Sequence, residues 1–280
     1  MSAGTAANHR EREKGVLVYP VYSRRSGGLS VGLNLFPDGK CCSFDCPYCE
    51  VFPSNSDRTF SLAVMEEALA EALVTTKERG ITVKDICFSG NGESTLSPHF
   101  PAALEAAFRI REEMATHAGT PCIGGAELVL ITNGTGLLDD RTFELLRDAA
   151  VKGLRIWLKL DAGTPAWYAA MARSEIAFQR LVEKIRAFVK NAPVTLQTMI
   201  CTINGEPPPP DEALAWQALV AELALDAAEL REVQIYGKAR SAPEDPLASA
   251  LPEAFLQARA DSLAAVLAGA GKEIPVRVYP

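Results

Sequence analysis

The alternation of short apolar runs with helical segments limits the fold of this chain more than any other feature. The apolar runs have the length and composition of buried strands and cover 29–36, 85–89, 127–132, 154–160, 194–201 and 232–236. Segments with helical periodicity separate these runs. The first begins at 62 and is expected to end at Gly80 as its C-cap, and the others cover 102–114, 140–151, 176–190, 211–222 and 252–267. Six β–α units in series predict a parallel sheet with right-handed crossovers.

The order of the strands cannot be read from one sequence, so a doubly wound sheet stays open beside a barrel. A length of 280 residues suits one large domain or two small ones. The proline run 207–210 and the segment 242–252 are expected to be loops, because neither flank looks complete. We therefore expect a single domain over 1–280, with a flexible start at 1–15 and a core at 20–240. Residues 241–280 should add a helix and a short edge or closing strand at 274–279.

The composition is that of a well-packed globular protein, with 48% hydrophobic and 22% charged residues. No apolar stretch has the roughly 18–20 residues of a membrane span, and residues 1–14 are too polar for a secretory signal or an anchor. A net charge of −7 weighs only weakly against an RNA substrate, since a local basic patch would suffice. Seven cysteines, three of them clustered, favour a reducing cytoplasm over a disulfide framework.

Three cysteines on one short loop, Cys42, Cys46 and Cys49, carry the strongest chemical signal. Their C-x3-C-x2-C spacing offers three soft thiolates, which can bind three irons of a [4Fe–4S] cube and leave the fourth iron open for chemistry. A structural zinc site usually closes its shell with a fourth Cys or His nearby. Zinc binding and chance spacing are the alternatives.

The other cysteines and the histidines give weaker signals. Four cysteines without short mutual spacing are expected to be buried thiols that pack as small apolar side chains, with a second cluster as the alternative: Cys41, Cys87, Cys122 and Cys201. The histidines, which show no catalytic triad with a nucleophile, are expected to be solvated or structural: His9, His99 and His117.

Polar residues gather where predicted strands end. The cysteine loop follows the first strand, and later strands end in 89–95, 132–134 and 159–163. Because the carboxyl ends of parallel strands form the active face of α/β folds, these segments are expected to share one site. Each also has a plainer interpretation: the glycine-rich 90–93 and Asn133-Gly134 are common turns. Lys159 and Asp161, which point the same way from one strand, could be a structural ion pair.

With these pieces in place, the chain resembles the radical S-adenosylmethionine (SAM) enzymes from about Pro20 to Lys238. The resemblance rests on the cysteine motif, on the aromatic Tyr48 before its last cysteine, and on the glycine–glutamate turn after the next strand. It implies an α/β fold of the partial (β/α)6 TIM-type barrel kind. It also implies a [4Fe–4S] cluster on Cys42, Cys46 and Cys49, a SAM amine held by Gly90, Gly92 and Glu93, and Tyr48 near the adenine.

Within that superfamily, four segments are similar to a group of iron–sulfur oxidoreductases related to the 4-demethylwyosine synthases. They are 23–34, Ser89-Gly90-Asn91-Gly92-Glu93-Ser94-Thr95-Leu96, Lys159-Leu160-Asp161-Ala162-Gly163 and Val233-Gln234-Ile235-Tyr236. Two positions depart from that group. Ser94 replaces the usual Pro after the motif glutamate, and no cysteine precedes Cys41 to hold the second cluster of the wyosine enzymes.

The resemblance implies reductive cleavage of SAM to a 5′-deoxyadenosyl radical, with an electron from a flavodoxin- or ferredoxin-like partner. The candidate catalytic residues are Lys159 and Asp161, and further candidates for cofactor contact are Asn133, Asp161, Gln197 and Tyr236. A small molecule or a peptide is the expected substrate. An RNA substrate is the alternative, favoured by Arg24 and Arg25 near the expected mouth. Activation of a glycyl-radical enzyme and a non-catalytic electron carrier also stay open.

Overall fold

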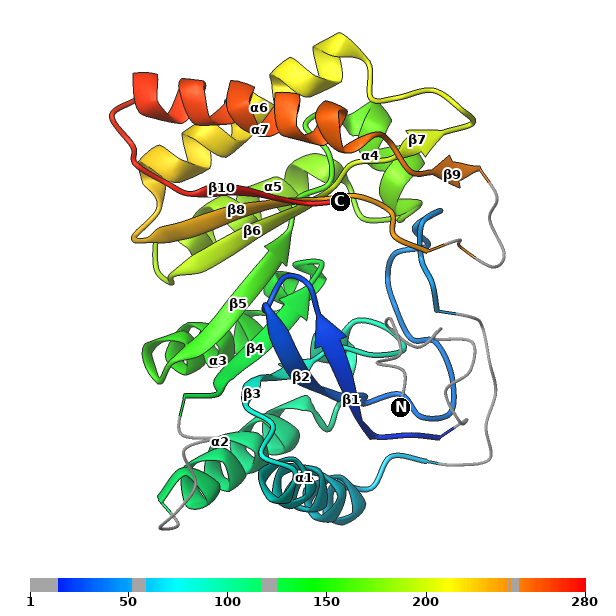
Figure 1. Cartoon of the computed structure of the whole chain (residues 1–280). Coiled ribbons are helices and arrows are strands. Elements are labelled where there is room, and N and C mark those ends of the chain that lie inside the picture. Colours follow the sequence, from blue (N-terminus) through cyan, green and yellow to red (C-terminus); the bar gives the residue numbers. More distant parts are fainter. Residues whose placement is uncertain (1–14, 52–58, 117–124, 241, 243–246) are drawn as a thin grey trace. The chain divides into compact units, whose positions relative to one another are not determined.

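The computed structural model describes residues 15–51, 59–116, 125–240, 242 and 247–280 (Figure 1). The chain divides into two compact units. Unit 1 comprises Met1–Cys42 and Val51–Ile131, and unit 2 comprises Ser43–Glu50 and Thr132–Pro280. A single domain over 1–280 and a flexible segment at 1–15 stay predictions.

Unit 1 is built on a mixed sheet. Its strands are β1 (Val18–Ser23), β2 (Gly28–Leu33), β3 (Val83–Phe88) and β4 (Glu127–Thr132). β1 pairs antiparallel with β2, whereas β2, β3 and β4 are parallel neighbours. The parallel strands confirm the predicted runs. β1 was not predicted, because Val18–Ser23 carries a proline and aromatic and polar residues typical of an edge strand.

The helices of unit 1 are α1 (Leu62–Glu78) and α2 (Phe100–Thr116), which pack against each other, and α1 also contacts β1 and β2. Met65, Leu69 and Leu73 form the buried stripe of α1. Gly80 follows α1 with a φ of +66°, so the predicted glycine C-cap is confirmed. A short 3-10 helix, η2 (Ser94–Leu96), follows the glycine turn.

Arg24 and Arg25 lie in the turn that joins β1 to β2. That turn precedes β2, so it lies at the amino end of the parallel strands β2 and β3. The cysteine loop and the glycine turn follow the carboxyl ends of the same strands. The expectation that these arginines line the mouth of the site is therefore wrong.

Unit 2 is built on a parallel sheet. Its strands, in spatial order, are β5 (Leu154–Lys159), β6 (Val194–Met199), β8 (Leu230–Tyr236) and β10 (Val276–Tyr279). β10 confirms the predicted edge strand near the C-terminus. A small antiparallel pair, β7 (Thr202–Ile203) with β9 (Ala248–Ser249), lies apart from this sheet.

The helices of unit 2 are α3 (Asp140–Val151), α4 (Pro165–Ala172), α5 (Phe178–Val189), α6 (Pro210–Asp226) and α7 (Glu253–Gly269), with a 3-10 turn η3 (Thr135–Leu138). α3 contacts β5, and α7 contacts β8 and β10 (Figure 1). All but α4 match predicted segments. α4 has only eight residues, too few to show a helical period. Pro210 begins α6, where proline is well tolerated.

The strands of unit 2 carry apolar and polar side chains in alternation. One set is apolar and buried: Ile156, Leu158, Leu196, Val233 and Ile235. The alternate positions carry polar groups and are register neighbours across the sheet: Lys159, Gln197, Gln234 and Arg277. Parallel strands buried on both faces are normally apolar throughout, so a polar face marks the side where function is expected.

Within the described residues, no helix combines the length and the apolar character that a membrane span requires.

Candidate functional site

The glycine turn of unit 1, Ser89–Glu93, is hydrogen-bonded to the start of the cysteine loop. The backbone N–H of Cys41 donates to the carbonyl oxygen of Asn91 at 2.9 Å, and the N–H of Glu93 donates to the carbonyl oxygen of Cys41 at 2.8 Å. The residue before Cys42 therefore pairs with the turn as a short parallel bridge. The structure thus joins the two motifs that the sequence singled out separately.

Both glycines of this turn are required by close approach. A Cβ on Gly92 would lie 1.8 Å from the carbonyl oxygen of Cys41, and the φ of Gly92 is +151°. A Cβ on Gly90 would lie 2.6 Å from Oδ1 of Asn34, which accepts a hydrogen bond from the N–H of Asn91 at 3.1 Å. The glycines let the turn lie directly against the segment that leads into the cysteine loop.

Glu93 ends this turn and caps η2. Its side chain is buried, and Oε1 accepts hydrogen bonds from the N–H of Thr95 at 3.3 Å and from Thr95 Oγ1 at 2.6 Å. The carboxylate is thus held in one orientation at the carboxyl end of β3. The predicted contact of Glu93 with the amine of SAM stays a prediction.

The cysteine loop continues into unit 2, where α4 supports it. The N–H of Asp45 donates to the carbonyl oxygen of Ala172 at the end of α4 at 2.8 Å, and the N–H of Cys49 donates to the carbonyl oxygen of Cys46 at 2.9 Å. Cys42, Cys46 and Cys49 are half-buried thiols. Burial raises the pKa of Cys46 to about 12, so binding of a metal there must displace a proton.

The donor chemistry of these residues suits an iron–sulfur cluster, but within the described residues no three His, Cys, Asp or Glu side chains gather as a metal site. Three soft sulfur donors stand within eight residues on a loop held by backbone hydrogen bonds. The loop also begins against a glycine turn that has no room for a side chain. Ligation by Cys42, Cys46 and Cys49 stays a prediction.

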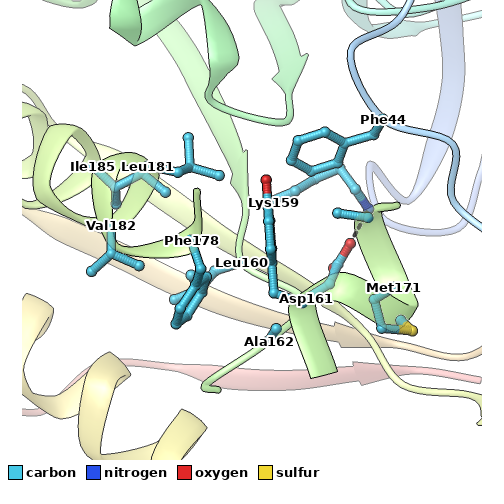
Figure 2. Close-up of a pocket in the computed structure, with 12 residues that line it drawn as sticks. Phe44, Lys159, Leu160, Asp161, Ala162, Met171, Phe178, Leu181, Val182 and Ile185 are labelled. Atoms are coloured by element: carbon cyan, nitrogen blue, oxygen red, sulfur yellow. Dashed lines mark ion pairs between the residues drawn. The ribbon is translucent and has the colours of Figure 1, made fainter. Parts of the chain in front are cut away.

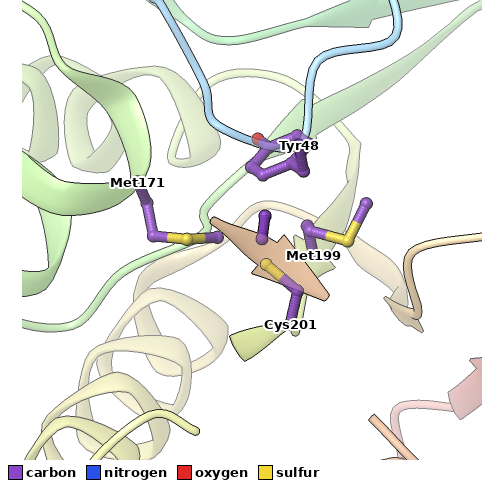
Figure 3. Packing of buried hydrophobic residues seen from close by; sticks show 5 residues of the cluster. Tyr48, Met171, Met199 and Cys201 are labelled. Carbon is purple, nitrogen blue, oxygen red and sulfur yellow. The ribbon is translucent and has the colours of Figure 1, made fainter. Parts of the chain in front are cut away.

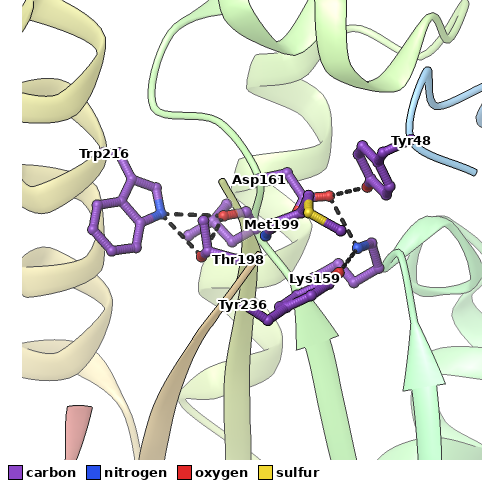
Figure 4. A network of polar contacts seen from close by, with 8 residues as sticks. Tyr48, Lys159, Asp161, Thr198, Met199, Trp216 and Tyr236 are labelled. Carbon is purple, nitrogen blue, oxygen red and sulfur yellow. Dashed lines mark hydrogen bonds and ion pairs between the residues drawn. The ribbon is translucent and has the colours of Figure 1, made fainter. Parts of the chain in front are cut away.

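Asp161 is the centre of a polar network in unit 2 (Figure 4). Oδ2 accepts a short hydrogen bond from Tyr48 Oη, and Lys159 Nζ lies 3.1 Å from the same oxygen. Oδ1 accepts from the N–H of Met199 at 2.8 Å. Lys159 and Asp161 do point the same way and form an ion pair, as one interpretation expected. Asp161 of this pair also accepts the hydrogen bond from Tyr48, so the ion pair is connected to the cysteine loop.

Lys159 is held as a cation. Its Nζ donates a short hydrogen bond to Tyr236 Oη and lies 5.0 Å from the ring centres of both Tyr48 and Tyr236. Burial alone lowers the pKa of Lys159, but Asp161 and Tyr236 outweigh it, and the net pKa is raised. Burial and the neighbouring Asp161 raise the pKa of Tyr48 as well. Lys159 therefore serves as a charged donor, because a nucleophilic amine would need a lowered pKa.

Asn133 is tied to the cysteine loop. Its Oδ1 accepts from the N–H and Oγ1 of Thr135 at 3.0 and 2.7 Å, and Nδ2 donates to Ser43 Oγ at 3.4 Å. Ser43 directly follows Cys42, so this hydrogen bond places Asn133 next to the cysteine loop. Its contact with a cofactor stays a prediction.

Gln197 lies deeper on the polar face of the sheet. It is fully buried, and its Nε2 donates to Gln234 Oε1 at 2.6 Å. In the sheet register it is the neighbour of Lys159 on the next strand. The structure links Gln197 to the network through the strands, and its predicted cofactor contact stays a prediction.

A small apolar cluster lies beside this network (Figure 3). Its buried members are Tyr48, Met171, Met199, Cys201 and Ala248, and Cys46, Trp167, Ile203 and Tyr236 pack against it. Cys201 and Cys87 are buried thiols, as predicted, and Cys122 lies outside the described residues. Cys41 is exposed, so the expectation of a buried thiol is wrong there. Its backbone, rather than its side chain, carries the contacts with the glycine turn.

Of the histidines, only His99 lies within the described residues. It is exposed and stacks on Phe60, with ring centroids 4.8 Å apart, as a solvated or structural histidine would.

A small cavity lies under the cysteine loop in unit 2 (Figure 2). Phe44 of the loop, Lys159, Asp161 and residues of α4 and α5 line a volume of about 20 Å³. That volume holds about one water molecule.

Glu212 and Trp216 of α6, which the sequence did not single out, hold the segment 160–164, which contains Asp161. Glu212 Oε1 accepts from the N–H of Gly163 at 2.6 Å, and Glu212 Oε2 accepts from the N–H of Thr164 at 2.9 Å and from its Oγ1 at 2.5 Å. Trp216 Nε1 donates to the carbonyl oxygen of Leu160 at 3.1 Å (Figure 4). Only their i, i+4 spacing was visible in the sequence, and that spacing is common in helices.

The sequence model of the Radical SAM superfamily matches residues 37–215. That stretch contains the cysteine loop, the glycine turn, Lys159 and Asp161, whereas Tyr236 and Trp216 lie beyond it. The curated UPF0026 protein of Helicobacter pylori is 28% identical to this chain over 130 residues, which cover 46% of this chain and 38% of that protein. The chain therefore matches well under half the length of this curated relative.

Solved structures share the fold. SuiB of Streptococcus suis bound to precursor peptide SuiA has a TM-score of 0.63 at 11% identity, over 87% of this chain and 47% of SuiB. TYW1 with a lysine–pyruvate adduct bound has a TM-score of 0.52 at 12% identity, over 84% of this chain and 73% of that structure. These likenesses confirm the predicted α/β fold of the partial TIM-barrel kind. TYW1 is a 4-demethylwyosine synthase. On its sequence, this chain is similar to an oxidoreductase group that is related to those enzymes.

Proposed function

Because the chain belongs to the radical SAM superfamily and is an enzyme of that class, we propose that it cleaves SAM reductively and takes a hydrogen atom from a substrate. The observation that carries the proposal is the backbone pairing of Cys41 with the glycine turn at Asn91 and Glu93. That pairing brings the start of the cluster loop to the turn expected to hold the SAM amine.

Cys42, Cys46 and Cys49 would hold the [4Fe–4S] cluster. When bound, the cluster supplies one electron that breaks a C–S bond of SAM and gives methionine and a 5′-deoxyadenosyl radical. The protein positions the reactants and excludes water. The buried apolar residues around Met199 and Cys201 pack against Cys46, so they can help to exclude water there.

Individual side chains are the proposed contacts for the rest of SAM. Glu93 is the acceptor for the ammonium, and the cationic Lys159 suits a carboxylate or a substrate anion. Asp161 and Asn133 offer acceptors and donors of the kind a ribose needs. Tyr48, which donates a hydrogen bond to Asp161, is the proposed neighbour of the adenine.

A flavodoxin- or ferredoxin-like protein is the proposed electron donor. We propose a small molecule or a peptide as the substrate, and the structural likeness to SuiB, solved with a precursor peptide, supports the peptide. RNA is the less favoured candidate, since Arg24 and Arg25 lie at the far end of their strands from the glycine turn. RNA or peptide that copurifies with the chain would separate the two.

The direct test is anaerobic reconstitution with iron and sulfide, followed by SAM and dithionite. We expect about four irons and four sulfides per chain, and formation of 5′-deoxyadenosine that depends on both SAM and reductant. A chain that takes up a full cluster but forms no deoxyadenosine would contradict the proposal.

Replacement of Glu93 by Gln should weaken SAM binding about tenfold. A charge-assisted hydrogen bond is worth on the order of 1.5–3 kcal/mol, and glutamine keeps an acceptor for the Thr95 donors that now bind Oε1. The measurement is SAM affinity and deoxyadenosine yield at matched iron content. Glu78→Gln, on the exposed end of α1, is the matched control. Equal SAM affinity in the Glu93 variant and the wild type would show that Glu93 only caps η2.

A further inference from the structure

The buried carboxylate of Glu212 is an anchor for the segment that follows β5. It is 3% exposed, and it accepts hydrogen bonds from two backbone N–H groups and one hydroxyl, all from Gly163 and Thr164. These N–H groups lie at the N-terminus of α4, which Thr164 caps by accepting from the N–H of Trp167. A carboxylate with this many partners fixes both the position and the direction of that backbone.

Trp216, one turn further along α6, fixes the same segment from its other end. Its Nε1 donates to the carbonyl oxygen of Leu160 and to Thr198 Oγ1 at 3.1 and 3.2 Å. A Cβ on Gly163 would lie 2.1 Å from the backbone nitrogen of Trp216. The segment therefore lies directly on α6, without room for a side chain in between.

The two ends of the anchored segment lead to the proposed site. Asp161 stands between the Leu160 and Gly163 contacts and holds Tyr48 and Lys159. At its far end, α4 offers the carbonyl oxygen of Ala172 to the N–H of Asp45 in the cysteine loop. Glu212 itself binds Gly163 and Thr164, whereas Tyr48 and Lys159 bind Asp161.

We propose that Glu212 is a positioning residue, which sets the place of the Asp161 carboxylate and of α4 beneath the cysteine loop. The inference rests on the proposed function, because it assumes that Asp161 contributes to SAM binding. A plain structural role is the competing view, in which Glu212 only stabilises unit 2. The two views differ in whether the effect of Glu212 on SAM passes through Asp161.

The first test is Glu212→Gln in the metal-free protein. Glutamine has one acceptor oxygen, so it cannot serve both N–H groups and the hydroxyl. We expect amide exchange in the segment 161–172 to become about tenfold faster, measured by hydrogen–deuterium exchange. Asp211→Asn, an exposed change in the same helical turn, is the matched control and should leave exchange unchanged. Unchanged exchange in Glu212→Gln would overturn the anchor.

The second test is a double-mutant cycle on SAM affinity in reconstituted protein. We expect Glu212→Gln to weaken binding about fivefold in the wild-type background and less than about twofold when Asp161→Asn is already present. Equal effects in both backgrounds would show a structural role only. If Asp161→Asn alone leaves SAM affinity unchanged, the proposed role of Asp161 in SAM binding fails. The hydrogen–deuterium exchange experiment then still tests whether Glu212 anchors the segment. Glu212→Asp, which keeps the charge, replaces the Gln variant if that variant does not fold, with the same expectations.

Discussion

The Cys46→Ala variant is expected to lose the cluster entirely, with no more than trace labile sulfide after reconstitution. Cys46 stands at the centre of the motif, and a cube held by only two thiolates loses a third of its protein ligation. The absorption near ~400 nm that belongs to thiolate-bound iron–sulfur clusters should vanish with it. Iron and sulfide analysis with the absorption spectrum is the measurement.

Cys41→Ala provides the control for this variant. Cys41 is the exposed neighbour of the motif, and its contacts with the glycine turn come from the backbone, which alanine keeps. It should hold as much iron as the wild type. One zinc per chain without sulfide in the wild type would refute iron–sulfur binding.

Gly92→Ala should both destabilise unit 1 and abolish SAM binding. A Cβ there would lie 1.8 Å from a backbone oxygen, at a φ of +151° that alanine rarely adopts. The turn and the residue before Cys42 must then separate, which breaks two backbone hydrogen bonds. Strain and lost bonds together cost about 3 kcal/mol in the free energy of unfolding. Urea unfolding and SAM affinity are the measurements.

Gly125→Ala is the matched glycine change, since no atom of the described residues lies within 4 Å of its added Cβ. It should shift the unfolding free energy by no more than about 0.5 kcal/mol. A Gly92→Ala variant as stable as the Gly125 variant, with SAM bound normally, would show that the turn has other ways to approach the loop.

The parallel core could be predicted because its signal is local. The strand β4 is largely an apolar run, and helices such as α3 keep a clear period. β1 could not be predicted, since its proline and its aromatic residues obscure any alternation. The eight residues of α4 are too few to show a period. A short helix of this kind is set by its cap at Thr164 and by the contacts of its ends.

The site was predictable where a residue belongs to a motif and not elsewhere. Lys159 and Asp161 were found because two charges on an apolar strand are costly without a partner. Their binding to Tyr48 could not be found, since it joins positions 113 residues apart. Glu212 escaped notice because a glutamate in a first helical turn is ordinary. The exposure of the Cys41 side chain could not be predicted, because it depends on a backbone pairing that no sequence pattern indicates.

The cysteine loop is fastened to the protein by hydrogen bonds that involve no metal. Cys41 pairs with the glycine turn in unit 1, and Asp45 and Tyr48 are held by Ala172 and Asp161 in unit 2. The ordering of the loop is therefore completed when the chain folds, and it need not be repeated when iron arrives. If the proposed cluster binds, the folded apoprotein would accept it without further ordering of this loop. A cluster destroyed by oxygen could be rebuilt on the same folded chain.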